Sequence, residues 1–258
     1  MAEPRATRTN LQGAAEAWAE CPEVMDFLVP TSPVHRLKLL ERDVYLSRWA
    51  TRVPPGARVL DAGGGIGRFA TWCLDRGCTV ELVDPDPRSL AAARRHGAAH
   101  GPRLRTHEAP AEALPDIEPV DVIIACELLC YVDEPARVLE HFRRLLRPGG
   151  VLLASVEAPY GWAMSVDAPA GFVDALFGDG VLAVPGDRYV RTYDAAAFRE
   201  LLTDWTIDDL WYTHYVLSGP FEGVTGEVEL PRLLELEARF RAHPVLAELG
   251  RAVAVIAR

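Results

Sequence analysis

Short apolar runs alternate with amphipathic stretches through the middle of the chain. The apolar runs predict five strands, at 58–62, 79–84, 103–108, 120–126 and 151–157. Helix-compatible stretches lie between them, at 66–76, 87–97 and 134–146. The strands are apolar along nearly their whole length, which is typical of parallel strands buried on both faces. The pattern therefore predicts an α/β fold, a Rossmann-like doubly wound sheet with helices on both faces.

The segments on either side of this core follow other patterns. Residues 11–18 and 34–49 have helical spacing, and Pro54-Pro55-Gly56 ends this region before the first strand. Helices in this position either form a lid over a bound molecule or pack against the edge of the sheet. After the fifth strand, residues 160–192 are rich in aromatic residues, glycine and proline and have no clear period.

The last part of the chain predicts an antiparallel pair of strands. A predicted helix at 193–203 is followed by the strand-like run 205–217, and the final apolar strand lies at 252–257. Between these two runs, residues 218–250 form an excursion that contains a predicted helix at 230–243. A long strand, an excursion and a final strand indicate a hairpin at the sheet edge, which brings the sheet to about seven strands.

A glycine-rich turn joins the first two predicted strands. The first strand ends near Asp61, and the second ends on Asp84. Between them the glycines stand at Gly63, Gly64, Gly65 and Gly67. Glycine is needed where the backbone adopts positive φ or passes close to a ligand. An acid at the end of the second strand is placed to accept both hydroxyls of a ribose. We interpret the segment as a nucleoside-binding βαβ unit; the alternative is a tight turn without a ligand.

Two classes of cofactor use this layout. Gly65-Ile-Gly-Arg-Phe-Ala70 satisfies the G-x-G-x-x-[G/A] fingerprint of dinucleotide sites, in which a diphosphate lies on the helix N-terminus. The carboxylate of Asp61 would repel that diphosphate, but it suits the ammonium of a methionine moiety. With Asp61 included, the turn has the form D-x-G-x-G-x-G, which resembles the first motif of class I S-adenosylmethionine-dependent methyltransferases. A nicotinamide-dependent oxidoreductase remains the alternative.

Further segments resemble the same family in the same order. Ala111-Glu-Ala-Leu-Pro115 is similar to its adenine-binding loop, 121–133 to its fourth strand and following turn, and 145–153 to its fifth strand. Cys130 stands where many relatives carry histidine. The resemblance implies S-adenosyl-L-methionine as the cofactor, and Arg68 is either a ligand of its carboxylate or a helix-surface arginine. The implied cofactor-binding residues are Asp61, Gly63, Gly65, Gly67, Arg68, Asp84, Pro85, Ala111, Glu112 and Cys126.

The resemblance also implies a reaction. Methyl transfer needs a nucleophile held in line with the sulfonium, and a base where the acceptor is a hydroxyl or a protonated amine. The candidate bases are His214, Tyr160, Glu157 and Tyr131, with His214 first because its unperturbed pKa suits neutral pH. The expected acceptor is an oxygen or nitrogen of a small organic molecule of secondary metabolism. The aromatic residues of the lid and of the two insertions fit a mostly apolar pocket for such a molecule.

Composition restricts the other possibilities. The chain has 258 residues, and its 27 basic and 37 acidic residues give a net charge of −10, which disfavours nucleic acid as a partner. The longest apolar runs are too short to span a bilayer, and the five cysteines form no metal-binding pattern. We therefore expect one cytoplasmic domain without metal, as a monomer or homodimer.

We divide this domain into three functional parts. Residues 1–50 form an N-terminal lid, 58–158 form the cofactor core, and 160–192 and 218–250 cover the acceptor. Alternatives to methyl transfer are other chemistry with the same cofactor, methylation of a peptide amine, and a non-catalytic binding protein.

Overall fold

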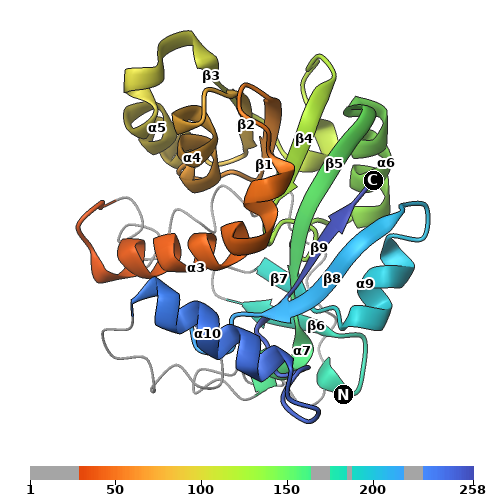
Figure 1. The fold of residues 1–258 in the computed structure, drawn as a ribbon. Coiled ribbons are helices and arrows are strands. Elements are labelled where there is room, and N and C mark those ends of the chain that lie inside the picture. Colours follow the sequence, from red (N-terminus) through yellow and green to blue (C-terminus); the bar gives the residue numbers. More distant parts are fainter. Residues whose placement is uncertain (1–28, 164–174, 185–187, 218–228) are drawn as a thin grey trace.

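The computed structural model describes residues 29–163, 175–184, 188–217 and 229–258. Its centre is a seven-stranded sheet in the order β3-β2-β1-β4-β5-β9-β8 (Figure 1). The strands are β1 (Arg58–Ala62), β2 (Thr79–Asp84), β3 (Leu104–Glu108), β4 (Val120–Ala125), β5 (Leu146–Glu157), β8 (Ile207–Thr213) and β9 (Ala252–Ala257). The first five are parallel, and β9 runs antiparallel between β5 and β8. The predicted doubly wound sheet with an antiparallel terminal pair is confirmed.

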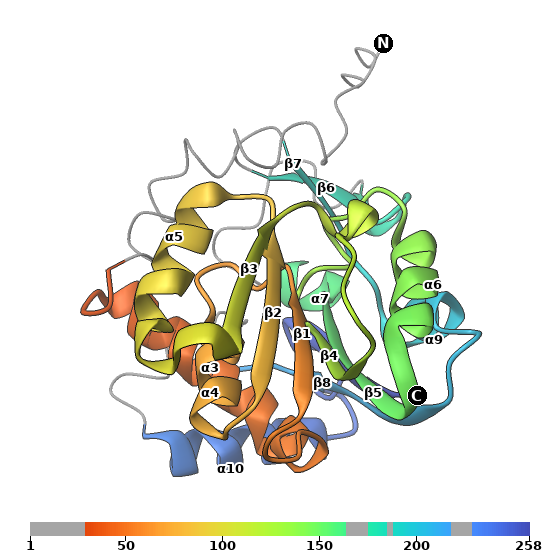
Figure 2. The ribbon, with the colours of Figure 1, turned by 90° about the horizontal axis from the view of Figure 1, so that it is seen from above.

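Helices cover both faces of the sheet, as Figure 2 shows from above. On one face lie α3 (Pro33–Trp49), α4 (Arg68–Asp75) and α5 (Pro87–His96), and on the other lie α6 (Pro135–Leu145) and α9 (Ala195–Leu201). The helix α10 (Leu230–Arg241) packs against α3 and β8. The shorter elements are η1 (Ala50–Arg52), η2 (Ala98–Arg103), η3 (Ala111–Ala113), α7 (Pro159–Ala163), β6 (Val181–Val184) and β7 (Arg188–Arg191). None of the helices in the described ranges has the length and hydropathy needed to cross a bilayer.

The helix α3 is held firmly on the sheet. Ser32 caps its N-terminus, accepting the backbone N–H of His35 at 2.9 Å. At its other end Trp49 is fully buried, and its indole Nε1 donates to the carbonyl of Val255 in β9 at 3.2 Å. The predicted helix at 34–49 thus exists and packs on the sheet, whereas the predicted helix at 11–18 lies outside the described residues. That residues 1–50 act as a lid stays a prediction.

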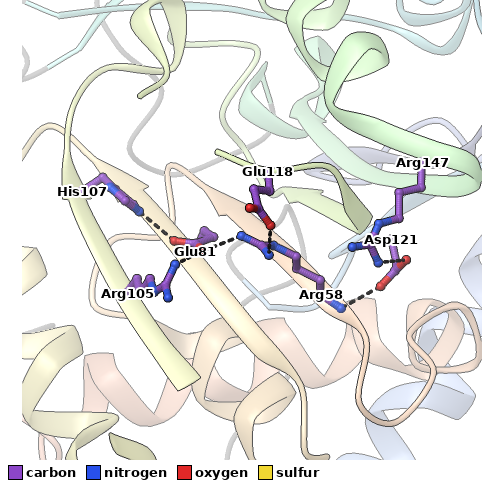
Figure 3. Close-up of polar contacts among 7 residues, drawn as sticks. All are labelled: Arg58, Glu81, Arg105, His107, Glu118, Asp121 and Arg147. Atoms are coloured by element: carbon purple, nitrogen blue, oxygen red, sulfur yellow. Dashed lines mark hydrogen bonds and ion pairs between the residues drawn. The ribbon is translucent and has the colours of Figure 1, made fainter. Parts of the chain in front are cut away.

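A charged network crosses one side of the sheet (Figure 3). Glu81 of β2 is buried, and its carboxylate pairs with Arg58 of β1 at 3.1 Å and with His107 and Arg105 of β3 at 2.8 and 3.5 Å. Arg58 also reaches Glu118 at 2.9 Å. Three neighbouring strands are therefore joined by side chains as well as by their backbone ladders.

Three segments differ from the pattern-based prediction. The strand β5 begins at Leu146, so Pro148-Gly-Gly150 belongs to the strand instead of only ending the preceding helix. The region 160–192 contains the two-stranded sheet of β6 and β7, which its irregular pattern did not indicate.

The strand β8 ends earlier than the predicted run 205–217. The carboxylate of Glu237 in α10 accepts the backbone N–H groups of His214 and Tyr215, both at 2.9 Å, and the hydroxyl of Thr213 at 3.1 Å. These amides are therefore unavailable to a neighbouring strand, and the ladder stops at Thr213.

Candidate active site

The glycine turn lies between the carboxyl ends of β1 and β2. Gly63 and Gly64 donate to the carbonyl of Val83 at 2.8 and 3.3 Å, which holds the turn against β2. Gly63, Gly65 and Gly67 have φ of 67°, 52° and 80°, a region that favours glycine. A Cβ on Gly65 would meet no atom within 4 Å, so this part of the turn faces open space. The predicted turn is thus a backbone surface that a ligand can approach closely.

Asp61 lies directly beneath this turn. It is almost fully buried, and its Oδ2 accepts the backbone N–H of Ala70 at 3.0 Å in the first turn of α4. A Cβ on Gly64 would lie 2.8 Å from the Asp61 carboxyl, so only glycine fits above it. Burial raises the pKa of Asp61 to about 7. A nearby cation would therefore stabilise the ionised form of this carboxyl, which agrees with the predicted contact with an ammonium group.

Asp84 carries the second carboxylate. Its Oδ2 accepts the N–H of Gly65 at 2.8 Å and its Oδ1 accepts the N–H of Asp86 at 2.9 Å, across Pro85. A carboxylate oxygen has two acceptor sites, so each oxygen retains one for a further donor. Burial raises the pKa of Asp84 to about 6. The arrangement fits the two hydroxyls of a ribose, the role predicted for this residue.

The remaining predicted cofactor residues lie along the next strands. Ala111 is buried in η3, and Glu112 accepts the backbone N–H of Asp133 at 3.1 Å, which ties this loop to the segment after β4. Cys126 follows β4, and its Sγ accepts the hydroxyl of Ser155 at 3.4 Å. The structure therefore brings these residues to the carboxyl end of the sheet, where open α/β folds bind ligands.

Arg68 begins α4 directly after the glycine turn. Its side chain is largely buried, and burial lowers the pKa of its guanidinium to about 10 against the opposing effect of Glu41 and Glu127. The structure thus places it inside the site instead of on an exposed helix surface. Its contact with a cofactor carboxylate stays a prediction.

The four candidate bases occupy different environments. His214 is buried after β8, with Nε2 3.1 Å from the carbonyl of Glu41, so Nε2 carries a proton and donates. Glu157 is buried at the end of β5 and accepts from Nε of Arg251 at 2.7 Å. Tyr131 and Tyr160 are partly exposed, after β4 and in α7. The structure places all four at the same end of the sheet, and their catalytic roles stay predictions.

A cluster of polar residues that the sequence analysis did not identify lies beside these candidates. The hydroxyl of Tyr45 in α3 donates to Oε1 of Glu127 at 3.0 Å. Lys38 and Glu41, also in α3, form an ion pair at 2.6 Å. The sequence does contain one signal for this cluster: Glu127 is an acidic residue directly after Cys126, at the end of a predicted strand. The partners on α3 are distant in the sequence, and no local pattern links them to it.

Comparisons with known sequences match this chain to methyltransferases. A model of the methyltransferase domain family matches residues 35–206. A ubiquinone biosynthesis O-methyltransferase of Xylella fastidiosa (strain 9a5c) is 34% identical over 132 residues, which cover 49% of this chain and 51% of that protein. An uncharacterized methyltransferase of Mycobacteroides abscessus is 37% identical over 102 residues, which are 39% of each chain. The chain therefore spans about half the length of the curated relatives it matches.

Solved structures share the fold. One is the 1,6-didemethyltoxoflavin-N1-methyltransferase of Burkholderia thailandensis, solved with 1,6-didemethyltoxoflavin and S-adenosylhomocysteine. Its TM-score is 0.57 at 22% sequence identity, and the match covers 88% of this chain and 80% of that protein. The [4+2]-cyclase SpnF has a TM-score of 0.62 at 16% identity and covers 97% of both chains.

Proposed function

Because the chain belongs to the family of class I S-adenosylmethionine-dependent methyltransferases, we propose that it transfers a methyl group to an oxygen or nitrogen of a small organic acceptor. The family and its cofactor, S-adenosyl-L-methionine, agree with the prediction from the D-x-G-x-G-x-G motif. The observation that carries the proposal is the pair of carboxyls on either side of a glycine turn that faces open space: Asp61 is buried and Asp84 is half-buried.

Different residues at the turn bind different parts of the cofactor. Asp84 accepts the ribose hydroxyls, Asp61 offers a negative charge to the amino group, and Gly65 allows the backbone to approach. When bound, the cofactor supplies an electrophilic methyl group on its sulfonium. The chain then has to hold the acceptor in line and exclude water, and placement of this kind is worth an effective molarity of roughly 10⁵ M or more.

The activities for which relatives are named support a small acceptor. The curated relative from Xylella fastidiosa is named an O-methyltransferase, and the toxoflavin enzyme is named an N1-methyltransferase. Within the site, Glu157, His214, Tyr131 and Tyr160 lie at the end of the sheet where an acceptor would bind, and we propose this end as the acceptor site. A role in secondary metabolism, a cytoplasmic location and a monomeric or homodimeric state are parts of the same proposal.

A direct test combines binding with product analysis. Calorimetry should detect S-adenosylmethionine and S-adenosylhomocysteine but not NAD. Incubation with S-adenosylmethionine and a panel of phenols and amines, followed by mass spectrometry, should give S-adenosylhomocysteine and a methylated product. Binding of NAD alone would indicate an oxidoreductase, and methylthioadenosine would indicate transfer of another part of the cofactor.

A second candidate is chemistry without methyl transfer. It is favoured by the likeness to SpnF, which is named a [4+2]-cyclase and matches the chain over nearly its whole length. A protein of this kind would bind the cofactor but form no S-adenosylhomocysteine with any acceptor. The same mass spectrometry therefore separates the two functions.

A further inference from the structure

Two residues with unusual backbone conformations meet at one side chain. Glu127 and His214 have φ of 52° and 61°, and they are the two non-glycine residues with positive φ in the part of the chain that the structure describes. Tyr45 contacts both: its hydroxyl donates to Glu127, and its ring centroid lies 4.4 Å from that of His214. Strained conformations of this kind persist only where surrounding contacts enforce them, and they are concentrated at functional sites.

The contacts that enforce the conformation of Glu127 come from β5 and from the turn after β4. Its backbone N–H lies 3.0 Å from both the carbonyl oxygen and the hydroxyl of Ser155. Its own carbonyl accepts from the thiol of Cys130 at 3.4 Å. The backbone is therefore fixed on both sides, and the carboxylate is directed toward Tyr45 on α3.

Glu127 differs from the other acids of this cluster in its partners. Glu157 pairs with Arg251, and Glu41 pairs with Lys38. Among the described residues Glu127 forms no ion pair, and the Tyr45 hydroxyl is the donor to its carboxylate. A carboxylate can accept about four hydrogen bonds, so this one has capacity for donors from a ligand.

The position of Glu127 links the two parts of the site. It follows Cys126 at the carboxyl end of β4, and the side chain of the next residue, Leu128, packs against the glycine turn, where a Cβ on Gly63 would lie 2.9 Å from it. On its other side Glu127 reaches α3 through Tyr45. Glu127 therefore lies at the carboxyl end of the sheet, between the glycine turn and α3.

We propose that Glu127 accepts the proton of the acceptor's nucleophile, and that the acceptor is a small molecule whose nucleophilic oxygen or nitrogen carries that proton when it binds. Tyr45 is a positioning residue that hydrogen-bonds the carboxylate, and His214 supports it by packing against the Tyr45 ring. The inference rests on the proposed function, because it assigns the proton that methyl transfer releases.

The step balances without another reactant. A lone pair of the acceptor's oxygen or nitrogen forms the bond to the methyl carbon, and the bond from that carbon to sulfur breaks with its electron pair remaining on sulfur. The proton of the nucleophile passes to a carboxylate oxygen of Glu127. The products are the methylated acceptor, S-adenosylhomocysteine and a protonated Glu127, which returns its proton to solvent after release.

The charges around Glu127 favour proton uptake. Burial and the negative charges of Glu157 and Glu41 raise its pKa, while Lys38 and His214 act in the opposite direction. The titratable and charged groups that face it are Lys38, Glu41 and Tyr45 of α3, Arg68 of α4, Cys126, Cys130, Glu157 of β5, His214 and Arg251. A carboxylate whose pKa lies closer to the working pH is a better proton acceptor.

The first test needs no knowledge of the natural acceptor. Protein labelled with ¹³C at glutamate carboxyls is studied by NMR with S-adenosylhomocysteine present, and the Glu127 signal is identified by its loss in Glu127→Gln. Methylammonium and phenol carry a proton on the nucleophile, whereas tetramethylammonium and anisole are the counterparts without one. We expect methylammonium or phenol to shift the Glu127 signal and both counterparts to leave it unchanged. No shift, or equal shifts with the counterparts, would overturn the inference.

The second test uses any acceptor that the panel methylates. Glu127→Gln should lower kcat by about 10²- to 10⁴-fold and remove the acidic limb of the pH profile, with S-adenosylmethionine affinity retained. Tyr45→Phe should shift that limb with a smaller loss. The matched control is Glu140→Gln, which changes an exposed acid on α6 and should leave kcat unaltered. An unchanged pH profile in a folded Glu127→Gln protein would contradict the proposal.

Different results would refute the proposed function and the role of Glu127. Absence of S-adenosylmethionine binding would refute the proposed function, whatever the Glu127 signal does. Binding of the cofactor without a donor-specific shift would refute the role of Glu127 alone.

Discussion

The carboxylate of Asp84 and the amide of Gly65 form a 2.8 Å hydrogen bond that joins the end of β2 to the glycine turn. The second oxygen of Asp84 accepts the N–H of Asp86, at the start of α5. One side chain therefore shapes the turn and is also the proposed ligand of the ribose. Changes at this residue act on both the conformation of the turn and the affinity for the cofactor.

Asp84→Ala should weaken the binding of S-adenosylmethionine by at least about 10-fold, because it removes charge-assisted hydrogen bonds. Calorimetry measures the change, and Asp204→Ala, at an exposed acid shortly after α9, serves as its control. Unaltered affinity in the Asp84 variant would show that the ribose lies elsewhere.

Asp61→Asn should change how stability depends on pH. The pKa of Asp61 rises from 3.8 to about 7 in the folded protein, so the folded state holds this proton more tightly than the unfolded state. Its contribution to stability is therefore present at low pH and is lost as pH rises from about 4 toward 7 and above. We expect the variant to be more stable than the parent at about pH 8, on the order of 2 kcal/mol, and not at about pH 4. Urea unfolding at both pH values measures this, and an equal effect at the two would contradict it.

Cofactor binding should release a proton from Asp61. An ammonium group close to this carboxyl favours its charged form and lowers its pKa. Calorimetry at about pH 6.5 in buffers of different ionisation enthalpy should detect proton release in the parent and less in Asp61→Asn. The same proton count in both proteins would mean that the amino group does not approach Asp61.

Gly64→Ala and Gly65→Ala should have different effects: the first should lower stability through a steric clash, and the second should lower affinity for the cofactor. A Cβ on Gly64 would lie 2.7 Å from Leu82 and 2.8 Å from the carboxyl of Asp61, so this variant should lose about 1–3 kcal/mol of stability. A Cβ on Gly65 meets no neighbour, so its cost is about 1 kcal/mol of backbone strain. Gly65→Ala should instead weaken S-adenosylmethionine binding more than folding. Thermal unfolding measures the stability of both variants, and calorimetry measures their affinity for S-adenosylmethionine. A Gly65→Ala protein less stable than Gly64→Ala would contradict the prediction.

Glu81→Gln should destabilise the sheet. The change removes the charge that pairs with Arg58, Arg105 and His107, and we expect a loss of about 2 kcal/mol. Glu118 also pairs with Arg58, but its side chain is 78% exposed, so Glu118→Gln should alter stability by less than about 0.5 kcal/mol. Urea unfolding of the two variants gives the difference, and similar losses would exclude a special role for the buried acid.

Much of the fold could be predicted because the relevant signals are local. The strands β1 and β2 begin and end at the predicted residues, since each is a short, mostly apolar run bounded by glycine, proline or charge. The glycine turn and its two acids are predicted from residue types, their spacing and the resemblance to a known motif, and Asp61, Gly65 and Asp84 lie together in the structure. Local sequence determines this part of the site.

The acceptor end of the site could not be predicted in the same way. Glu127 has a defined environment only because Tyr45 approaches it from α3 and Ser155 fixes its backbone from β5. The burial of His214 depends on α3 and α10, which no pattern near residue 214 reveals. These properties arise from tertiary contacts between distant segments, so apolar periodicity and motif spacing contain no record of them.

The carboxylate of Glu237 has a consequence for how proteins of this design diversify. It attaches α10 to the chain at Thr213, His214 and Tyr215, next to the proposed acceptor site, and it has no part in the glycine turn. Mutations that reposition α10 would thus remodel the neighbourhood of His214 while nucleoside recognition persists. Under the proposed function, evolution could exchange the molecule that is modified and keep the donor of the modification.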